Sequence, residues 1–299
     1  MGRFLALFIV LALLGSAQAQ DLIGGEAPRY TGRTLTVPPF AAAVRARHWA
    51  PGLNEGYVPQ GLTFADGRLL VGAYRSTDPQ QNRGPARVFA VDPRTGAVVG
   101  GFDLPATVGH ADGLAAGRDG RLYVADNSRR LLVVDRAASL AAGQARVIGE
   151  RRMAAGDENP GTNFLSFDGT RLWFGRYARD GQARIFAARP DRMFGAKEPF
   201  QAADAERSLP LPLFVQGATF DADGKLWIAA SNSRFGRFYR LEPTDGRVLA
   251  EHDGIAGLED LARDDAGRLW VLGEAGSQRW LNWSSFYPLL FALDIRALR

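Results

Sequence analysis

The sequence of 299 residues contains no cysteine and only three histidines and three methionines. The absence of cysteine excludes disulfides, thiolate-ligated zinc or iron–sulfur centres, and a thiol nucleophile. No G-x-S-x-G nucleophile motif, phosphate-binding loop or H-E-x-x-H zinc motif occurs either. Glycine, in contrast, is plentiful with 35 residues, which favours a turn-rich β protein over a helical one.

Long runs of one kind of side chain are also scarce. The formal net charge is +4, but no basic cluster occurs, so the sequence predicts no nucleic-acid partner. The one long apolar run, residues 4–14, follows Arg3 and precedes the small-residue tripeptide 17–19. This pattern predicts a secretory signal peptide over residues 1–19 and a periplasmic or secreted product. No later run approaches the ~20 apolar residues of a membrane helix, so we expect no membrane span.

A five-fold repeat organises residues 20–299, which we expect to form one domain. Each unit has a short apolar run, a turn with glycine, and a strand-like run that reads basic–Leu–bulky–aliphatic. The basic residues are Arg68, Arg121, Arg171, Lys225 and Arg268. Asp-Gly between apolar runs is a strong hairpin signal, because glycine readily takes a positive φ. A third run follows each hairpin, and a fourth follows in three units, at 97–99, 145–148 and 247–250.

Four short antiparallel strands per unit, repeated every 43 to 53 residues, are typical of β-propeller blades. We therefore predict an all-β propeller of five four-stranded blades, with six blades as the alternative. The last unit has no room for a fourth strand, which an N-terminal strand at residues 33–37 could supply to close the ring. Residues 191–212 lack periodicity and are interpreted as a long connection. A closed ring is expected to be a monomer.

The repeat also places one polar residue at the start of each innermost strand, beside the central channel where propeller ligands bind. These residues are Gln60, Asp112, Asn163, Gln216 and Glu259. The chain returns to the same mouth after each second strand, because neighbouring strands are antiparallel. The residues predicted there are Tyr74, Arg75, Asn127, Arg176, Tyr177, Asn232, Arg234 and Glu274, with Asp260 and His110 nearby. Trp280 and Trp283, in the loop after Glu274, are candidate aromatic residues of the rim.

Three interpretations of this mouth follow from the residue types. In the first, Asp112, Asn163 and Glu259 hold a calcium ion, which prefers several carboxylate and amide oxygens. Proton transfer would then fall to His110, Asp112 or Glu274.

The second interpretation has no metal. The mouth binds a small polar molecule, and Arg75, Arg176 or Arg234 grips its carboxylate or phosphate. Gln60, Gln216, Asn127 and Asn232 would supply further hydrogen bonds. In the third interpretation the polar side chains only hydrogen-bond one another and channel water.

The motif of polar residue–Gly–aliphatic, then Asp-Gly-Arg-Leu-aromatic-Val, resembles the gluconolactonase/regucalcin group of strictosidine-synthase-like propellers. Residues 110–113 and 122–127 carry the closest likeness, and residues 58–62 also resemble exported bacterial propellers of unassigned function. The resemblance implies an axial divalent cation, calcium or zinc, and hydrolysis of lactones or related esters. Asp112, Asn163 and Glu259 match the metal ligands of that group by position in their repeats. Gln60, Gln216 and the count of five units depart from its usual pattern, which has six blades.

The sequence thus predicts an exported propeller that is a metal-dependent hydrolase of a lactone, an ester or a similar small substrate. The alternative is a non-catalytic propeller of the cell envelope that binds a ligand or serves as a scaffold. A third option is a carbohydrate-active enzyme, which would need two carboxylates across a cleft, Asp112 with Glu259 or Glu274.

Overall fold

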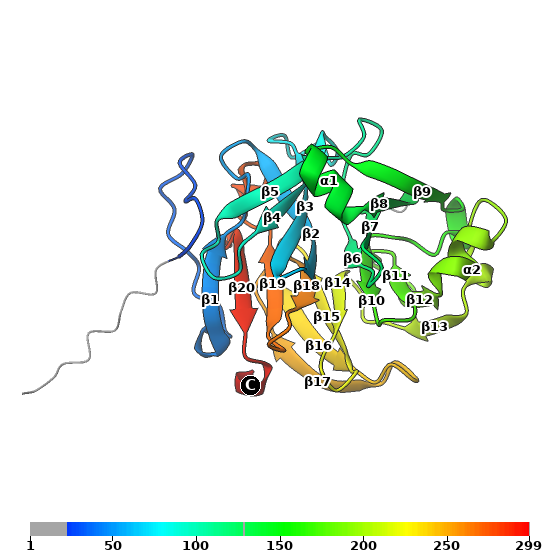
Figure 1. Cartoon of the computed structure of the whole chain (residues 1–299). Coiled ribbons are helices and arrows are strands. Elements are labelled where there is room, and N and C mark those ends of the chain that lie inside the picture. The colour runs from blue at the N-terminus through cyan, green and yellow to red at the C-terminus, as the bar shows by residue number, and fades with distance from the viewer. Residues whose placement is uncertain (1–22, 128, 299) are drawn as a thin grey trace, which may run out of the picture.

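The computed structural model describes residues 23–127 and 129–298. Its strands form five four-stranded antiparallel sheets, arranged as the blades of a β-propeller (Figure 1). The predicted all-β class and the five blades are therefore confirmed. The predicted signal peptide, residues 1–19, lies outside the described residues.

Four blades follow one another along the chain. The first contains β2 (Tyr57–Ala65), β3 (Arg68–Arg75), β4 (Ala86–Val91) and β5 (Val98–Asp103). The second contains β6 (Leu114–Ala116), β7 (Arg121–Asp126), β8 (Arg130–Asp135) and β9 (Arg146–Arg152). The third contains β10 (Phe164–Phe167), β11 (Leu172–Gly175), β12 (Arg184–Ala188) and β13 (Arg207–Pro210). The fourth contains β14 (Val215–Phe220), β15 (Leu226–Ser231), β16 (Gly236–Leu241) and β17 (Val248–Asp253).

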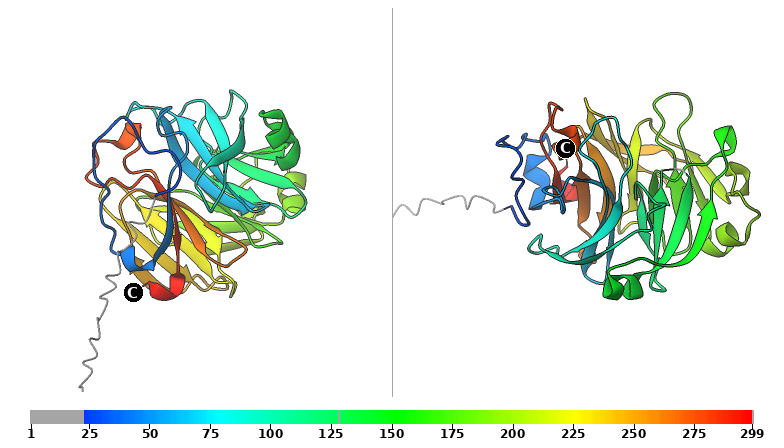
Figure 2. Two further views of the ribbon diagram at one scale, coloured as in Figure 1. Left: turned by 60° about the vertical axis from the view of Figure 1, so that its left-hand side comes forward. Right: turned by 90° about the horizontal axis from the view of Figure 1, so that it is seen from above.

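The fifth blade joins both ends of the described chain. It contains β18 (Leu258–Arg263), β19 (Leu269–Gly273) and β20 (Leu289–Leu293), and β1 (Val44–Trp49) is its outermost strand. Figure 2 shows β1 beside β20, with which it pairs antiparallel. An N-terminal strand thus closes the ring, but it is not the expected segment 33–37. That segment instead lies on the loop before β20, where the Thr36 N–H donates to the Phe286 carbonyl at 3.0 Å.

Short helices occupy the connections. They are α1 (Arg136–Ala142), α2 (Pro190–Gly195), and the 3₁₀ turns η1 (Ala41–Ala43), η2 (Gly156–Glu158), η3 (Ala202–Asp204), η4 (Gln278–Trp280) and η5 (Ile295–Ala297). None of the helices in the described ranges is long and apolar enough to cross a membrane. Residues 191–212 are not only a connection, because they supply part of α2 and all of β13.

The hydrophobic core lies between neighbouring blades. Val58 and Leu70 of the first blade, for example, pack in one cluster with Leu122 and Val134 of the second. The innermost strands come so close that several positions admit only glycine. A Cβ atom on Gly113 would lie 2.7 Å from the Leu165 nitrogen, and one on Gly217 would lie 2.4 Å from the Asp260 Cα. Packing therefore requires the glycine of the polar–Gly motif, whereas it does not by itself explain the polar residue before that glycine.

Candidate functional site

Three of the five polar ring residues lie at irregularities of the innermost strands. Strand pairing shifts between Pro59 and Leu62, between Val215 and Gly217, and between Leu258 and Leu261. Such bulges change the direction of a side chain and are frequent beside functional sites. The ring residues within these three intervals, Gln60, Gln216 and Glu259, all line one cavity.

This axial cavity has a volume of about 620 Å³ and gathers most of the residues predicted at the mouth. The predicted residues that line it are Gln60, His110, Asn163, Gln216, Asn232, Arg234, Glu259 and Glu274. The predicted tyrosines Tyr74 and Tyr177 and the rim candidates Trp280 and Trp283 also line it, and the structure adds Arg179, Phe214 and Arg279. The two tryptophan rings stack on each other with their centroids 4.6 Å apart. The cavity therefore combines acid, amide and guanidinium groups with an aromatic wall.

Two predicted arginines are not brought to the cavity. Arg75 is exposed at the end of β3 and lines a separate depression, whereas the buried Tyr74 beside it lines the axial cavity. Arg176 is likewise exposed, and Tyr177 takes its place in the lining. Successive side chains of an extended chain point in opposite directions, so only one member of each predicted pair, the tyrosine, faces the cavity.

The floor of the cavity holds a pair of buried glutamates from the same blade. Glu259 is 4% exposed and Glu274 is 6% exposed, and their carboxyl groups are hydrogen-bonded to each other. Gln216 donates to Glu259 at 3.0 Å, and Gln60 donates to Glu274 at 2.9 Å. The Trp280 indole N–H also donates to Glu274, at 2.7 Å.

The environment of this pair changes how it titrates. Burial raises the pKa of Glu274 to about 7, although the hydrogen bonds from Glu259, Trp280 and Gln60 oppose that rise. Burial and the neighbouring Glu274 carboxylate also raise the pKa of Glu259, well above its usual range. Near neutral pH the two carboxyl groups therefore share at least one proton.

Asp112 lies behind Asn163 rather than in the cavity lining. Asn163 Nδ2 donates to Asp112 Oδ2 at 2.8 Å and to Asn127 Oδ1 at 3.1 Å. The backbone N–H of Asn127 donates to the other oxygen of Asp112 at 2.9 Å. Burial nevertheless raises the pKa of Asp112 to about 7. The predicted residues Asp112 and Asn127 thus hold Asn163 in place from behind.

His110 is a neutral member of the lining. Its ring stacks on Tyr74 at a centroid distance of 4.4 Å, and its Nδ1 lies 3.8 Å from Asp112 Oδ2. That nitrogen is buried and has no hydrogen-bond partner among the described residues. Burial lowers the pKa of His110 to about 3, so the ring carries no charge at neutral pH. A role in proton transfer would require a ligand or water at Nδ1.

Asp260, expected among the carboxylates of the mouth, instead joins two innermost strands. It is fully buried, and its carboxylate accepts hydrogen bonds at 2.8 Å from the backbone N–H groups of Leu62 and Leu261. These bonds connect β2 of the first blade to β18 of the last. Asp260 therefore helps to close the ring.

The groups predicted to hold a cation are engaged in hydrogen bonds with one another. Asp112 bonds to Asn163, but Glu259 bonds to Gln216 and Glu274 instead. Among residues 23–127 and 129–298, no group of three or more His, Asp or Glu side chains could hold a metal ion. A cation would have to displace N–H donors that already satisfy these carboxylates. The calcium or zinc ion stays a prediction, and no catalytic step below depends on it.

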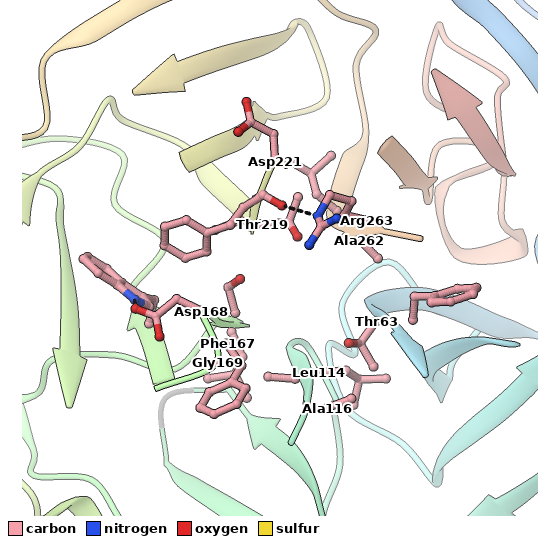
Figure 3. Close-up of a pocket in the computed structure, with 18 of the residues that line it drawn as sticks. Thr63, Leu114, Ala116, Phe167, Asp168, Gly169, Thr219, Asp221, Ala262 and Arg263 are labelled. Atoms are coloured by element: carbon pink, nitrogen blue, oxygen red, sulfur yellow. Dashed lines mark hydrogen bonds between the residues drawn. The ribbon is translucent and has the colours of Figure 1, made fainter. Parts of the chain in front are cut away.

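A second cavity, of about 600 Å³, lies among the hairpin turns of the innermost strands (Figure 3). Three of its four carboxylates, those of Asp168, Asp221 and Asp264, accept hydrogen bonds from groups of the fold itself. Asp168 accepts the Trp173 indole N–H at 2.7 Å, and Asp221 accepts that of Trp227 at 3.0 Å. Arg263 donates to the Phe220 carbonyl at 3.0 Å (Figure 3). This turn cavity offers no pair of free carboxylates.

No protein-family model matches the chain, and no curated protein matches it either. Solved structures do resemble it in fold. Glutaminyl cyclase from Myxococcus xanthus is 14% identical with a TM-score of 0.56, over 84% of this chain and 94% of that chain. Virginiamycin B lyase from Staphylococcus aureus is 15% identical with a TM-score of 0.41, over 77% and 67% of the two chains.

The first of these likenesses supports the β-propeller class and nothing finer, because the identity is so low. The second is too distant to bear on the site. The resemblance to the gluconolactonase/regucalcin group stays a prediction.

Proposed function

We propose that the axial cavity is an active site in which Glu274, assisted by Glu259, transfers a proton during a reaction at the carbonyl group of a small polar substrate. The observation that carries this proposal is the pair of buried, mutually hydrogen-bonded glutamates in a cavity of ligand size. A group that titrates near neutral pH can both accept and donate a proton, which general acid–base catalysis requires.

The neighbouring side chains fit this role. Gln60 and Trp280 fix the orientation of the Glu274 carboxyl group, and Gln216 does the same for Glu259. Trp283 and Tyr177 supply an apolar surface for the rest of the substrate. With two carboxyl groups sharing protons, Glu259 can return a proton to Glu274 after each transfer.

Hydrolysis of a lactone or ester is one reaction that such a site would support, as the sequence predicts. Glu274 would accept a proton from a water molecule as its oxygen adds to the carbonyl carbon. The same proton would then pass to the alkoxide oxygen as the acyl–oxygen bond breaks. The products are a carboxylic acid and an alcohol, joined in one molecule when the substrate is a lactone.

A second candidate is the cyclisation of a glutaminyl residue, which the fold likeness to glutaminyl cyclase brings to this chain. The α-amino nitrogen would add to the side-chain amide carbon and give its proton to Glu274. Glu274 would return that proton to the amide nitrogen, which leaves as ammonia. This reaction requires one proton to move in each direction and no activated water, so the glutamate pair suits it.

The test is turnover by the purified protein on a panel of lactones, esters and glutaminyl compounds. We expect Glu274→Gln to lower the rate about 100-fold or more, because general acid–base catalysis contributes that much. The matched control is Glu150→Gln, at an exposed glutamate of β9. In the unaltered protein, kcat/KM should fall as the pH decreases through about 7, where Glu274 becomes protonated.

Two results would overturn the proposal. One is a Glu274→Gln variant that retains the activity of the unaltered protein. The other is an absence of turnover across the panel by a protein that still binds these compounds saturably at the cavity. The second result would favour the non-catalytic binding propeller of the cell envelope. Export itself is inferred only from the sequence of residues 1–19, and cleavage after Ala19 is its direct test.

A further inference from the structure

Three arginines of the axial cavity lack a carboxylate partner. Arg179, Arg234 and Arg279 line the cavity, and none of them forms an ion pair within the part of the chain that the structure describes. Nearby Arg83, in contrast, pairs with the buried carboxylate of Asp126 at 3.0 Å. The cavity therefore presents cationic groups whose charge the fold leaves uncompensated.

Arg279 is the most informative of the three because it is only 6% exposed. Its guanidinium group donates to the carbonyls of Asp78 at 3.2 Å and Pro79 at 3.1 Å, and to the Tyr74 hydroxyl. All three acceptors are neutral, and burial lowers the pKa of Arg279 to about 10. A buried charge without a counter-ion is costly, and a ligand anion can relieve that cost.

The Arg279 guanidinium group still has N–H groups with which it can bind such an anion. It has five N–H bonds, of which the three acceptors take one each, so about two remain. The Trp280 ring covers one face of the guanidinium, with the Arg279 Cζ atom 4.1 Å from the ring centroid. The open N–H bonds therefore lie in a fixed plane, an arrangement suited to a carboxylate.

The glutamates of the cavity do not neutralise these arginines. Glu259 and Glu274 bond to each other and to amide or indole N–H groups, as described above, and they retain at least one proton near neutral pH. Arg179 and Arg234 are exposed at the mouth, where they would attract an anion from solution. The cavity thus has a cationic side and a proton-transfer side.

We propose that the substrate of this cavity is an anion, a carbonyl compound whose carboxylate binds Arg279 after Arg179 and Arg234 have drawn it into the mouth. This inference rests on the proposed function and names the substrate class. Trp280 shows how far Glu274 lies from Arg279, because its indole N–H bonds to Glu274 while its ring face covers the Arg279 guanidinium. The carboxylate and the reacting carbonyl are therefore separated by only a few bonds, as in a carboxylated lactone or in glutamine with its own free carboxylate.

The test compares the binding of glutarate with that of glutaramide, its uncharged diamide of similar size, by calorimetry and by tryptophan fluorescence. We expect glutarate to bind at least tenfold more tightly than the diamide, and more weakly as salt is added. Arg279→Gln should remove at least tenfold of the affinity for glutarate. The matched control is Arg75→Ala, at an exposed arginine outside the cavity.

Arg234→Ala and Arg179→Ala keep the test decisive if Arg279→Gln does not fold, because both residues are exposed and each substitution should weaken glutarate severalfold. Equal binding of glutarate and glutaramide, or unchanged glutarate binding in all the folded arginine variants of the cavity, would overturn the proposal. Glu274→Gln separates this proposal from the proposed function. If that variant binds glutarate normally while the protein proves inactive on every compound, the anion site stands and the enzyme does not.

Discussion

The two cavities beside the innermost strands have nearly the same volume, about 620 Å³ for the axial cavity and 600 Å³ for the turn cavity. They differ in how they shift the pKa values of the carboxyl groups that line them. In the turn cavity, burial acts to raise the pKa of Asp221, yet hydrogen bonds from Lys225, Trp227 and Arg240 outweigh it and the pKa falls. In the axial cavity burial dominates, and the pKa values of Glu259 and Glu274 rise.

The difference separates structural from functional carboxylates. A carboxylate surrounded by the donors of its own hairpin is stable as an anion and has no reason to exchange a proton. A carboxyl group buried beside a second carboxyl group and facing a cavity is kept in a state that costs stability when it ionises. The turn cavity also contains arginines, but its carboxylates other than the exposed Asp265 already bind donors of the fold, so size alone does not identify the site.

The largest change in the free energy of unfolding that we expect follows from removing a structural carboxylate. Asp264 is 3% exposed and accepts hydrogen bonds from the Arg268 backbone N–H, the Arg268 side chain and the Trp270 indole. Asp264→Ala should lower the free energy of unfolding by about 3 kcal/mol, because it leaves buried donors unpaired. Urea unfolding measures this, with Asp265→Ala at the exposed neighbouring residue as the control. Equal losses in the two variants would contradict the structural role.

A smaller change in stability, in the opposite direction, is expected when a carboxyl group of the axial cavity is replaced. The folded state raises the pKa of Glu274 from 4.5 to about 7, so the folded protein binds this proton more tightly than the unfolded chain. Its contribution to stability is therefore present below about pH 4.5 and is lost as the pH rises through about 7. At pH 8 Glu274→Gln should raise the free energy of unfolding by about 1 kcal/mol, because the buried charge is removed.

Unfolding in urea at pH 5 and pH 8 provides the measurement. The gain should shrink or reverse at pH 5, where the glutamate is protonated. Glu150→Gln, on the exposed face of β9, should show no comparable dependence on pH. A Glu274→Gln variant that is less stable than the unaltered protein at both pH values would place Glu274 with the structural carboxylates.

The smallest effect concerns a cation. Because N–H donors already occupy Asp112 and Glu259, we expect calcium or zinc at about 1 mM to shift the melting temperature by less than about 1 °C. Thermal unfolding with and without the cation is the measurement, and Asp112→Asn is the comparison variant. A rise of several degrees that Asp112→Asn abolishes would instead establish the cation site predicted from the sequence.

Local signals made most of the fold predictable. Glycine turns between apolar runs mark a hairpin in each blade, and the repeat alone yields the five-fold count. The outermost strand of each blade is harder to predict, because it pairs with one strand only and so needs a less regular alternation of apolar and polar residues. β13 is four residues long and ends at Pro210, a residue that an edge strand tolerates. The sequence predicts the closing strand at 33–37 rather than at β1, because both segments alternate apolar and polar residues.

The residues of the axial cavity also divide into those that the repeat predicts and those that it does not. Its ring residues follow from the repeat, since a polar residue begins the innermost strand of every unit, and a glycine follows it in three units, after Gln60, Asp112 and Gln216. Arg279 has no such signal, because it lies in the non-repeating loop between β19 and β20. The N-terminal segment holds that loop over the cavity through tertiary contacts, among them those of Arg33 with the carbonyls of Leu281, Trp283 and Ser284.

The sequence by itself determined the propeller, the number of blades and the polar ring, because hairpins and alternation are local properties of the chain. Tertiary structure decided which polar groups stay uncompensated. Whether a carboxylate meets N–H donors or another carboxylate, and whether an arginine meets a counter-ion, depends on residues that are distant in sequence. Burial then converts that geometry into pKa shifts, which no local pattern encodes.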